Sequence, residues 1–281
     1  MVSCFQGQHI LWLLRRLKFY VIINSFICAV TAAALLVQTR IPHSVVGSYA
    51  GILVRLACMI GWFEWISTFK GKIYGAKRMM LTRPQQLSIL CHILVVVVPT
   101  EMATLFVGSS YVGVTTPTTY TSVLEEFVYF IPKSLVLELV FDLFHFGMHY
   151  TCHQIPLLYQ YVHKQHHMHL HPSPLSTYEE SPVDLILTNV VPMAIALAVG
   201  PSLSLHQLHL LLAYKTYVEV AGHSGLDIKG MSFPQMPLVQ CVHICIRVHD
   251  HDLHHTHPSV NFAKRFSIWD RLFRTYKAST M

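Results

Sequence analysis

The chain has 281 residues, of which 53% are hydrophobic and only 12% are charged. Because an ordinary soluble domain carries about 25% charged residues, this composition argues against a water-soluble globular protein and favours a protein embedded in lipid. The net charge of +6 is explained by basic loops between apolar segments, so we expect a membrane, and no nucleic acid, as the partner of this chain.

Four long apolar segments are predicted to cross the membrane. The first, residues 19–37, follows basic residues and contains nineteen residues without a charge, which is enough to span a bilayer. Because it is longer than the apolar part of a signal peptide, we interpret it as an uncleaved anchor, with a cleavable signal peptide as the alternative. The next three predicted spans are residues 49–66, 87–107 and about 127–146.

Two shorter apolar segments follow, residues 184–199 and 203–220, and Gly200-Pro201 separates them. Each of the two is short for a membrane span. Together they are therefore predicted to form a hairpin that dips into the membrane and returns.

The loop charges predict the orientation of these spans. Basic residues, with no acidic one among them, lie between the second and third spans, whereas residues 108–122 carry no charge. The basic residues are Lys70, Lys72, Lys77, Arg78 and Arg83. Because loops rich in lysine and arginine remain in the cytosol, this loop and the N-terminus are predicted to be cytosolic. Four spans then place everything after about residue 146 in the cytosol.

These features predict an all-α fold, namely an integral membrane helical bundle of about four spans plus a membrane hairpin, with a cytosolic helical cap rich in histidine. Residues 1–126 are predicted to form N-terminal transmembrane helices, and residues 127–281 contain the clustered histidines. No internal repeat or soluble linker separates the two parts, so we expect one integrated membrane unit.

The spacing of the histidines places them on common helical faces. Residues 145–153 read "HFGMHYTCH", residues 163–167 read "HKQHH" and residues 251–255 read "HDLHH". Positions i, i+3 and i+4 of a helix share one face, so each segment predicts a stripe of imidazoles. The histidines of the three stripes are His145, His149, His153, His163, His166, His167, His251, His254 and His255.

Imidazoles gathered in this way indicate a metal site. A structural zinc site has four ligands and often uses cysteine, whereas here eight or more histidines converge and none of the seven cysteines is suitably spaced. Imidazole binds zinc, copper, iron and nickel, so the ligand type leaves the metal open. Two metal ions with four or five imidazoles each would use the whole set. A histidine-rich metal transporter and a non-catalytic scaffold are the alternatives of a different class.

The pattern HxxxH, HxxHH, HxxHH resembles the fatty acid hydroxylase and sterol desaturase superfamily of integral membrane, non-haem di-iron oxidases. The resemblance covers about residues 142–276, so residues 127–281 are identified as a catalytic region of this kind. Asp142 sets the register in which His149 and His153 are the first matching pair. Tyr150 stands where the family has an arginine.

Two further stretches carry the resemblance. The segment "PSPLSTYEESPVD" is similar to the proline-flanked segment of sterol C-5 desaturases, with Ser181 in place of a histidine before Pro182 and Asp184. The stretch "EVAGHSG" places His223 where the family has its late histidine. The closing stretch, residues 251–276, resembles cholesterol 25-hydroxylases at least as closely as C-5 desaturases.

The resemblance implies a set of nine metal ligands and a set of residues around them. The implied ligands are His149, His153, His163, His166, His167, His223, His251, His254 and His255. Metal-bound histidines usually donate their other ring nitrogen to a carboxylate or carbonyl. The expected additional ligands or hydrogen-bond partners are His145, His171, His249, Asp142, Asp252 and Glu219.

The implied function is that of an oxygen-dependent oxidase with two iron ions, which hydroxylates or desaturates a lipid, with a sterol favoured. A fatty acyl or sphingoid-base substrate is the alternative within the superfamily. No dinucleotide-binding or cytochrome b5 haem motif is found in the sequence, so electrons are expected from NAD(P)H through an external cytochrome b5 and its reductase. The expected location is the endoplasmic reticulum, with the metal site facing the cytosol.

Overall fold

The structure is a computed structural model, and it describes residues 2–42, 44–73, 78, 80–111, 123–228, 232–236 and 242–279. Lys77 of the basic loop and most of the uncharged loop 108–122 lie outside the described residues. The described residues fold into helices, and the extended pairing among them is an isolated bridge between Cys245 and Phe266.

The helices divide into long helices, which build the bundle, and short ones, some of them single 3-10 or π turns marked η. In chain order they are α1 (Val2–Arg40), α2 (Ser44–Ser67), α3 (Arg83–His92), η2 (Ile93–Val97), α4 (Val98–Ser109), α5 (Val123–Gln154), α6 (Pro156–Leu158), η3 (Tyr159–His163), η4 (His166–Met168), η5 (Ser176–Tyr178), α7 (Pro182–Leu185), η6 (Ile186–Val190), α8 (Val191–Val199), α9 (Leu205–His223), α10 (Val248–Thr256) and α11 (Ile268–Leu272).

Four helical stretches among the described residues are long and apolar enough to cross a membrane. They are Leu17–Arg40, Ser44–Ser67, Arg83–Ser109 and Pro182–Val199. The first three match the first three predicted spans. The fourth consists of α7, η6 and α8, and it corresponds to the first arm of the predicted hairpin. The chain is thus an integral membrane helical bundle, as predicted.

Helix α5, the predicted fourth span, is not among these candidate spans, and within residues 127–146 it carries Lys133, Glu138 and Asp142. The two carboxylates of this set are buried and have partners inside the protein. Glu138 pairs with Arg265 at 2.7 Å, and Asp142 accepts hydrogen bonds from backbone N–H groups. Because these partners follow α10 in the sequence, α5 joins the bundle to the histidine-bearing end of the molecule.

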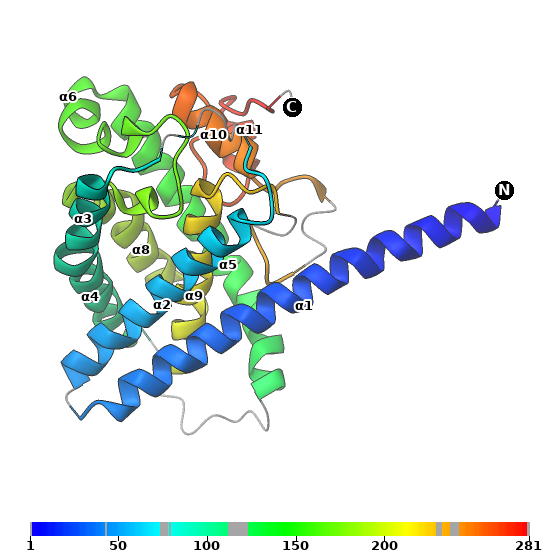
Figure 1. Cartoon of the computed structure of the whole chain (residues 1–281), viewed down its shortest axis with the longest axis horizontal. Helices are drawn as coiled ribbons and strands as arrows, with labels where there is room; N and C mark the ends of the chain where they lie inside the picture. The colour runs from blue at the N-terminus through cyan, green and yellow to red at the C-terminus, as the bar shows by residue number, and fades with distance from the viewer. Residues whose placement is uncertain are drawn as a thin grey trace.

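Helix α9 lies within the bundle (Figure 1), where it contacts α1, α2, α4, α5 and α10. Nearly every residue from Gln207 to His223 is buried. A helix that is buried on all sides is apolar all round, which explains why residues 203–220 read as a membrane segment. Its last residue, His223, lies where α9 packs against α10.

Close packing of α1 against α2 depends on two small residues four positions apart. A Cβ atom on Gly47 would lie 2.5 Å from the carbonyl oxygen of Gln38, and one on Gly51 would lie 2.8 Å from that of Ala34. Small residues at this spacing let two membrane helices approach closely. The pair α1–α2 therefore forms one wall of the bundle.

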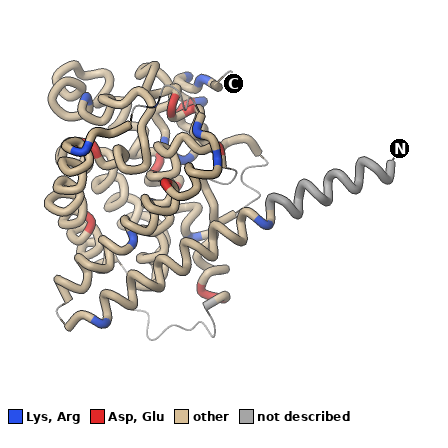
Figure 2. The backbone as a smooth tube through the Cα atoms, viewed as in Figure 1, with Lys and Arg blue, Asp and Glu red and all other residues tan. Residues whose placement is uncertain are grey.

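The short helices α6, α10 and α11 lie at the same end of the bundle, with α10 and α11 near the C-terminus (Figure 1). Charged residues are sparse along the long helices, and many of them lie toward this end (Figure 2). This arrangement agrees with the predicted histidine-rich cap on an apolar bundle.

Candidate metal centre

The first histidines of the site come from the C-terminal end of α5. His145, His149 and His153 follow one another at intervals of four residues, so their rings line one face of the helix. The ring centroids of His145 and His149 are 5.3 Å apart, and those of His149 and His153 are 5.0 Å apart. Only the last two of these rings meet the other histidine segments closely.

Three further segments face this stripe: η3 and η4, the C-terminal end of α9, and α10. Their histidines form two adjoining groups with the stripe, and within each group the ligand atoms all lie within 4.8 Å of one another. The first group is His149, His153, His163, His167 and His254. The second group is His166, His223, His251 and His255. The structure thus brings together all nine histidines that the sequence predicts as ligands.

The Nε2 atoms of these rings converge. In the first group, the Nε2 atom of His163 lies 3.0 Å from that of His149 and 3.1 Å from that of His167. In the second group, the Nε2 atom of His251 lies 3.0 Å from that of His223 and 3.3 Å from that of His255. Convergent imidazole nitrogens of this kind are the donor set that a transition metal ion takes.

The opposite ring nitrogens are held by the surrounding protein. The Nδ1 atom of His149 lies 2.7 Å from the carbonyl oxygen of Phe262, and that of His254 lies 2.7 Å from the carbonyl oxygen of Val260. The Nδ1 atom of His223 lies 2.8 Å from the carbonyl oxygen of Glu219. Since a carbonyl only accepts, each of these Nδ1 atoms carries the proton, and the Nε2 lone pair is left for a metal.

Burial keeps the imidazoles neutral. Burial, together with the charges of His163 and His223, lowers the pKa of His254 to about 3, although the hydrogen bond to the Val260 carbonyl raises it. Burial first, and then the neighbouring histidines, also lower the pKa of His251 and His255 well below the usual value. Neutral imidazole is the form that binds metals. The Nε2 atom of His254 is buried without a hydrogen-bond partner among the described residues, so the donor set fits a bound metal ion.

A backbone segment after α10 supplies two of the carbonyls, and two aspartates hold it in place. Asp142 accepts hydrogen bonds of 2.8 Å from the N–H groups of residues 264, 265 and 266. Asp270 accepts from the N–H groups of residues 262 and 263 at 2.8 and 2.9 Å. Asp142, predicted as a ligand or a partner of a ligand, is instead an acceptor for this backbone, because its position on α5 faces the returning chain.

The predicted flanking histidines lie outside both groups. The Nδ1 atom of His145 lies 2.6 Å from the carbonyl oxygen of Thr188. His171 lies 3.4 Å from Asp252, and His249 lies 3.9 Å from Asp227.

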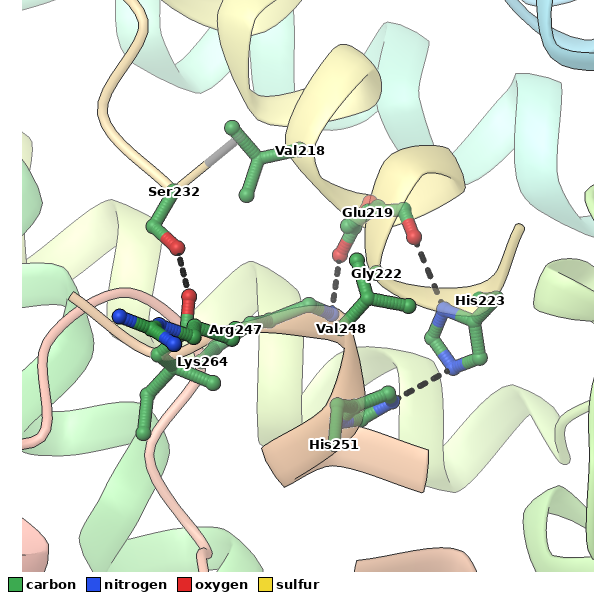
Figure 3. Close-up of a pocket in the computed structure, with 10 residues that line it drawn as sticks. Val218, Glu219, Gly222, His223, Ser232, Arg247, Val248, His251 and Lys264 are labelled. Carbon is green, nitrogen blue, oxygen red and sulfur yellow. Dashed lines mark hydrogen bonds and ion pairs between the residues drawn. The ribbon is translucent and has the colours of Figure 1, made fainter. Parts of the chain in front are cut away.

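The two predicted carboxylates, Asp252 and Glu219, act on other partners. Asp252 pairs with Arg78. The Glu219 carboxylate receives the ammonium groups of Lys215 and Lys264 at 2.9 and 2.6 Å, while its backbone carbonyl holds His223. Figure 3 shows Lys264 reaching Glu219, and His223 pointing to His251 across the gap between α9 and α10.

A cavity faces both groups of histidines. It is lined by ligand candidates from each group, including His163 of the first and His166 of the second, and by Glu180, Asp184 and Lys264. Glu180 and Lys264 were not among the predicted site residues. No local signal distinguishes them, because only the fold places them beside the histidines.

Asp184 is a site residue that lies in a motif recognisable in the sequence. Its carboxylate oxygens lie 2.9 and 3.0 Å from the Nδ1 atom of His163. It occupies the acidic position of the His-Pro-x-Asp pattern, in which Ser181 replaces the histidine. The Ser181 hydroxyl accepts a hydrogen bond from the Asp184 N–H and donates one to the carbonyl of Val162. Ser181 is therefore the N-cap of α7, and it positions Asp184.

Replacing Asp184 by alanine is expected to weaken metal retention by the first group about 10- to 100-fold, because loss of a carboxylate that orients a ligand has effects of that size. Dialysis of the purified protein against a chelator, with metal counted over time, measures the change. Glu179→Ala is the matched control, since Glu179 lies 2.6 Å from His169, which belongs to neither group. Equal losses in the two variants would contradict the assignment of Asp184.

The C-terminal half of the chain is similar to known proteins. The model of a family described as fatty acid hydroxylase matches residues 134–275. Over 169 residues the chain is 28% identical to the fatty acid hydroxylase vlmA of a Lecanicillium species, covering 57% of this chain and 46% of the relative.

Two sterol enzymes are also similar. Over 147 residues the chain is 28% identical to cholesterol 25-hydroxylase of Homo sapiens, covering 51% of this chain and 50% of the relative. Over 139 residues it is 28% identical to the C-4 methylsterol oxidase erg25 of Schizosaccharomyces pombe, covering 48% and 43%. The chain spans about half the length of the curated relatives it matches. No solved structure matches it.

Proposed function

Because this chain belongs to the fatty acid hydroxylase family, we propose that it is an oxygen-dependent membrane oxidase that hydroxylates or desaturates a lipid, with two iron ions held by nine histidines. The observation that carries the proposal is the pair of adjoining histidine groups, each with its ligand atoms within 4.8 Å of one another. We assign the five histidines of the first group to one ion and the four of the second group to the other.

A sterol is the substrate class we favour. Relatives named cholesterol 25-hydroxylase and C-4 methylsterol oxidase support a sterol, and a relative named fatty acid hydroxylase supports a fatty acyl chain as the alternative. For hydroxylation, one C–H bond and dioxygen, with two electrons and two protons, give an alcohol and water. For desaturation, two adjacent C–H bonds are lost instead, and two molecules of water form.

The residues of this chain bind and orient the reacting parts. The iron ions would supply the activation of dioxygen. The carbonyls of Phe262, Val260 and Glu219, with the Asp184 carboxylate, hold the histidine rings in the tautomer that binds metal. The cavity that faces both groups is where the reacting carbon would lie. Exclusion of water from such a site prevents side reactions.

The electron donor and the location are part of the same proposal. Electrons would come from NAD(P)H through cytochrome b5 and its reductase at the cytosolic face of the endoplasmic reticulum. Residues 1–126 would anchor the catalytic region, residues 127–281, in the bilayer. None of the nine histidines lies in the four candidate spans found among the described residues, which speaks against a metal transporter with its ligands along a membrane path.

Turnover under oxygen-18 gas tests the proposal. The purified protein, loaded with iron and supplied with cytochrome b5, its reductase and NAD(P)H, is given a sterol, a fatty acyl lipid or a sphingoid base in separate lipid discs. A hydroxylase adds one labelled oxygen atom to its lipid, whereas a desaturase removes two hydrogens and adds no label. If product forms from the fatty acyl lipid alone, the substrate is a fatty acyl chain and the sterol assignment is wrong. If the iron-loaded protein forms no product from any of the three lipids, the proposal fails.

A further inference from the structure

Arg78 comes from the basic loop between α2 and α3, yet its side chain is only 6% exposed. Its guanidinium group makes three polar contacts. The Nε atom donates to the carbonyl of Ile73 at 2.8 Å, one terminal nitrogen donates to the carbonyl of Pro172, and the other pairs with the Asp252 carboxylate, which is fully buried. This loop arginine is therefore built into the interior of the histidine-bearing end.

Arg78 and the loop that carries it contact the three chain segments that supply the second group of histidines. Pro172 follows the segment that carries His166, and Asp252 is next to His251 on α10. Gly225 comes two residues after His223, and its carbonyl accepts a hydrogen bond of 2.7 Å from the N–H of residue 73 in the same loop.

Gly225 leaves the space in which the guanidinium group lies. A Cβ atom at this position would overlap the guanidinium of Arg78, and the backbone φ of +69° is one that residues with a Cβ rarely adopt. Both features suit glycine alone. The chain after α9 is thus shaped to receive Arg78.

The ion pair with Asp252 fixes the rotation of α10. Successive residues of an α-helix are separated by about 100°, so Asp252 projects about a quarter turn from the face that carries His251 and His255. One carboxylate oxygen of Asp252 contacts Arg78 and His171, and the other is buried without a hydrogen-bond partner among the described residues. Arg78 is therefore the arginine that pairs with this buried carboxylate, with His171 beside the same oxygen.

From these contacts we propose that Arg78 is a positioning residue for the second group of histidines, His166, His223, His251 and His255. It ties the three segments that carry them to one another from outside the site. The inference rests on the proposed function in taking these histidines as metal ligands. It also assigns a role in the site to a residue outside the matched region 134–275.

The first group is held by other contacts. Asp184 and the carbonyls of Phe262 and Val260 hold three of its histidines. None of these three contacts involves Arg78. Loss of Arg78 is therefore expected to weaken retention of the ion in the second group more than that of the ion in the first group.

Metal retention by the full-length protein in detergent tests the inference, with cobalt(II) as the probe. The Arg78→Met variant, loaded to two ions per chain, is expected to lose one of them about 10- to 100-fold faster than the unmodified protein during dialysis against a chelator. The visible absorption of the second ion should change with it, while that of the first is kept. Arg83→Met is the matched control, because Arg83 is an exposed arginine of the same basic region, and it should retain both ions.

Two more variants keep the test decisive if Arg78→Met does not fold. Asp252→Asn removes the same ion pair with little change in shape, and it should lose the same ion. Arg78→Lys keeps the charge but lacks the planar fork of the guanidinium group. Its rate of metal loss should lie between those of the unmodified protein and Arg78→Met. Retention of both ions by Asp252→Asn or by Arg78→Met, at the rate of the unmodified protein, would overturn the inference. If the unmodified protein itself does not bind two ions, the proposed metal centre fails instead.

Discussion

Replacing His254 by alanine is expected to lower product formation by at least about 100-fold, because removing a ligand costs more than removing the partner of a ligand. His254 is fully buried at the centre of the first group, with its ring centroid 4.5 Å from that of His149 and 4.8 Å from that of His167. Iron content should fall from two ions per chain to about one. Mass spectrometry of the metal and of the lipid product measures both effects on the same sample.

The control for this variant is His257→Ala. His257 lies three residues further along the same histidine-rich stretch, but its side chain is exposed and belongs to neither group. It should therefore keep both metal ions and its activity. An active His254→Ala protein with two ions, or an equal loss in His257→Ala, would show that the groups are not the metal site.

Replacing Asp142 by alanine is expected to have the largest effect on stability. The change leaves the N–H groups of residues 264, 265 and 266 without their acceptor, and two of these three hydrogen bonds are buried. Each unsatisfied buried donor costs about 1–3 kcal/mol, so the total is a large part of the roughly 5–15 kcal/mol that stabilises a folded protein. We expect little folded protein in the membrane, as measured by the monodisperse fraction after detergent extraction.

Two further variants serve as controls for the loss of folded protein. Asp142→Asn keeps one acceptor oxygen and should retain part of the folded protein. Asp227→Ala removes a carboxylate that is 63% exposed, and it should give the yield of the unmodified protein. Normal yield of Asp142→Ala would mean that the backbone segment is held in some other way.

The positions of eight of the nine histidines could be predicted because their spacing is local, whereas His223 was predicted from the resemblance of its stretch to the family. Intervals of three and four residues put imidazoles on one side of a helix whatever the rest of the chain does. How they divide between the groups could not be predicted in this way. His166 and His167 are adjacent in the sequence and belong to different groups, as are His254 and His255. That division depends on which segments face each other in the folded bundle.

The carboxylates were harder to assign from the sequence than the histidines. Asp142 lies seven residues before His149 and was predicted as its neighbour in the site, yet it holds the backbone of a distant segment. Asp184 was recognised only as part of a motif, and it holds His163. A carboxylate accepts from any donor that the fold brings near, so spacing along the chain does not identify its partner.

The basic loop shows a similar limit. The rule that predicts membrane orientation counts lysine and arginine as charges that stay in water. Arg78 was one of the five residues counted, and it is almost fully buried beside Asp252. Similarly, Glu138 and Asp142 on α5 lie inside the protein, where Arg265 pairs with Glu138 and the returning backbone donates to Asp142. A sequence pattern indicates whether most of a segment faces water or lipid. Whether one charged side chain is buried depends on the contacts that the fold gives it.

Each group of histidines joins parts of the chain that are synthesised far apart in time, since α5 and η4 are complete long before α10 is made. An ion bound by such a group acts as a reversible cross-link, and it stabilises only the folded form. The lifetime of the protein in the cell would then follow the supply of that metal. A shortage of the metal would then lower the amount of protein in the cell, in addition to the activity of each molecule.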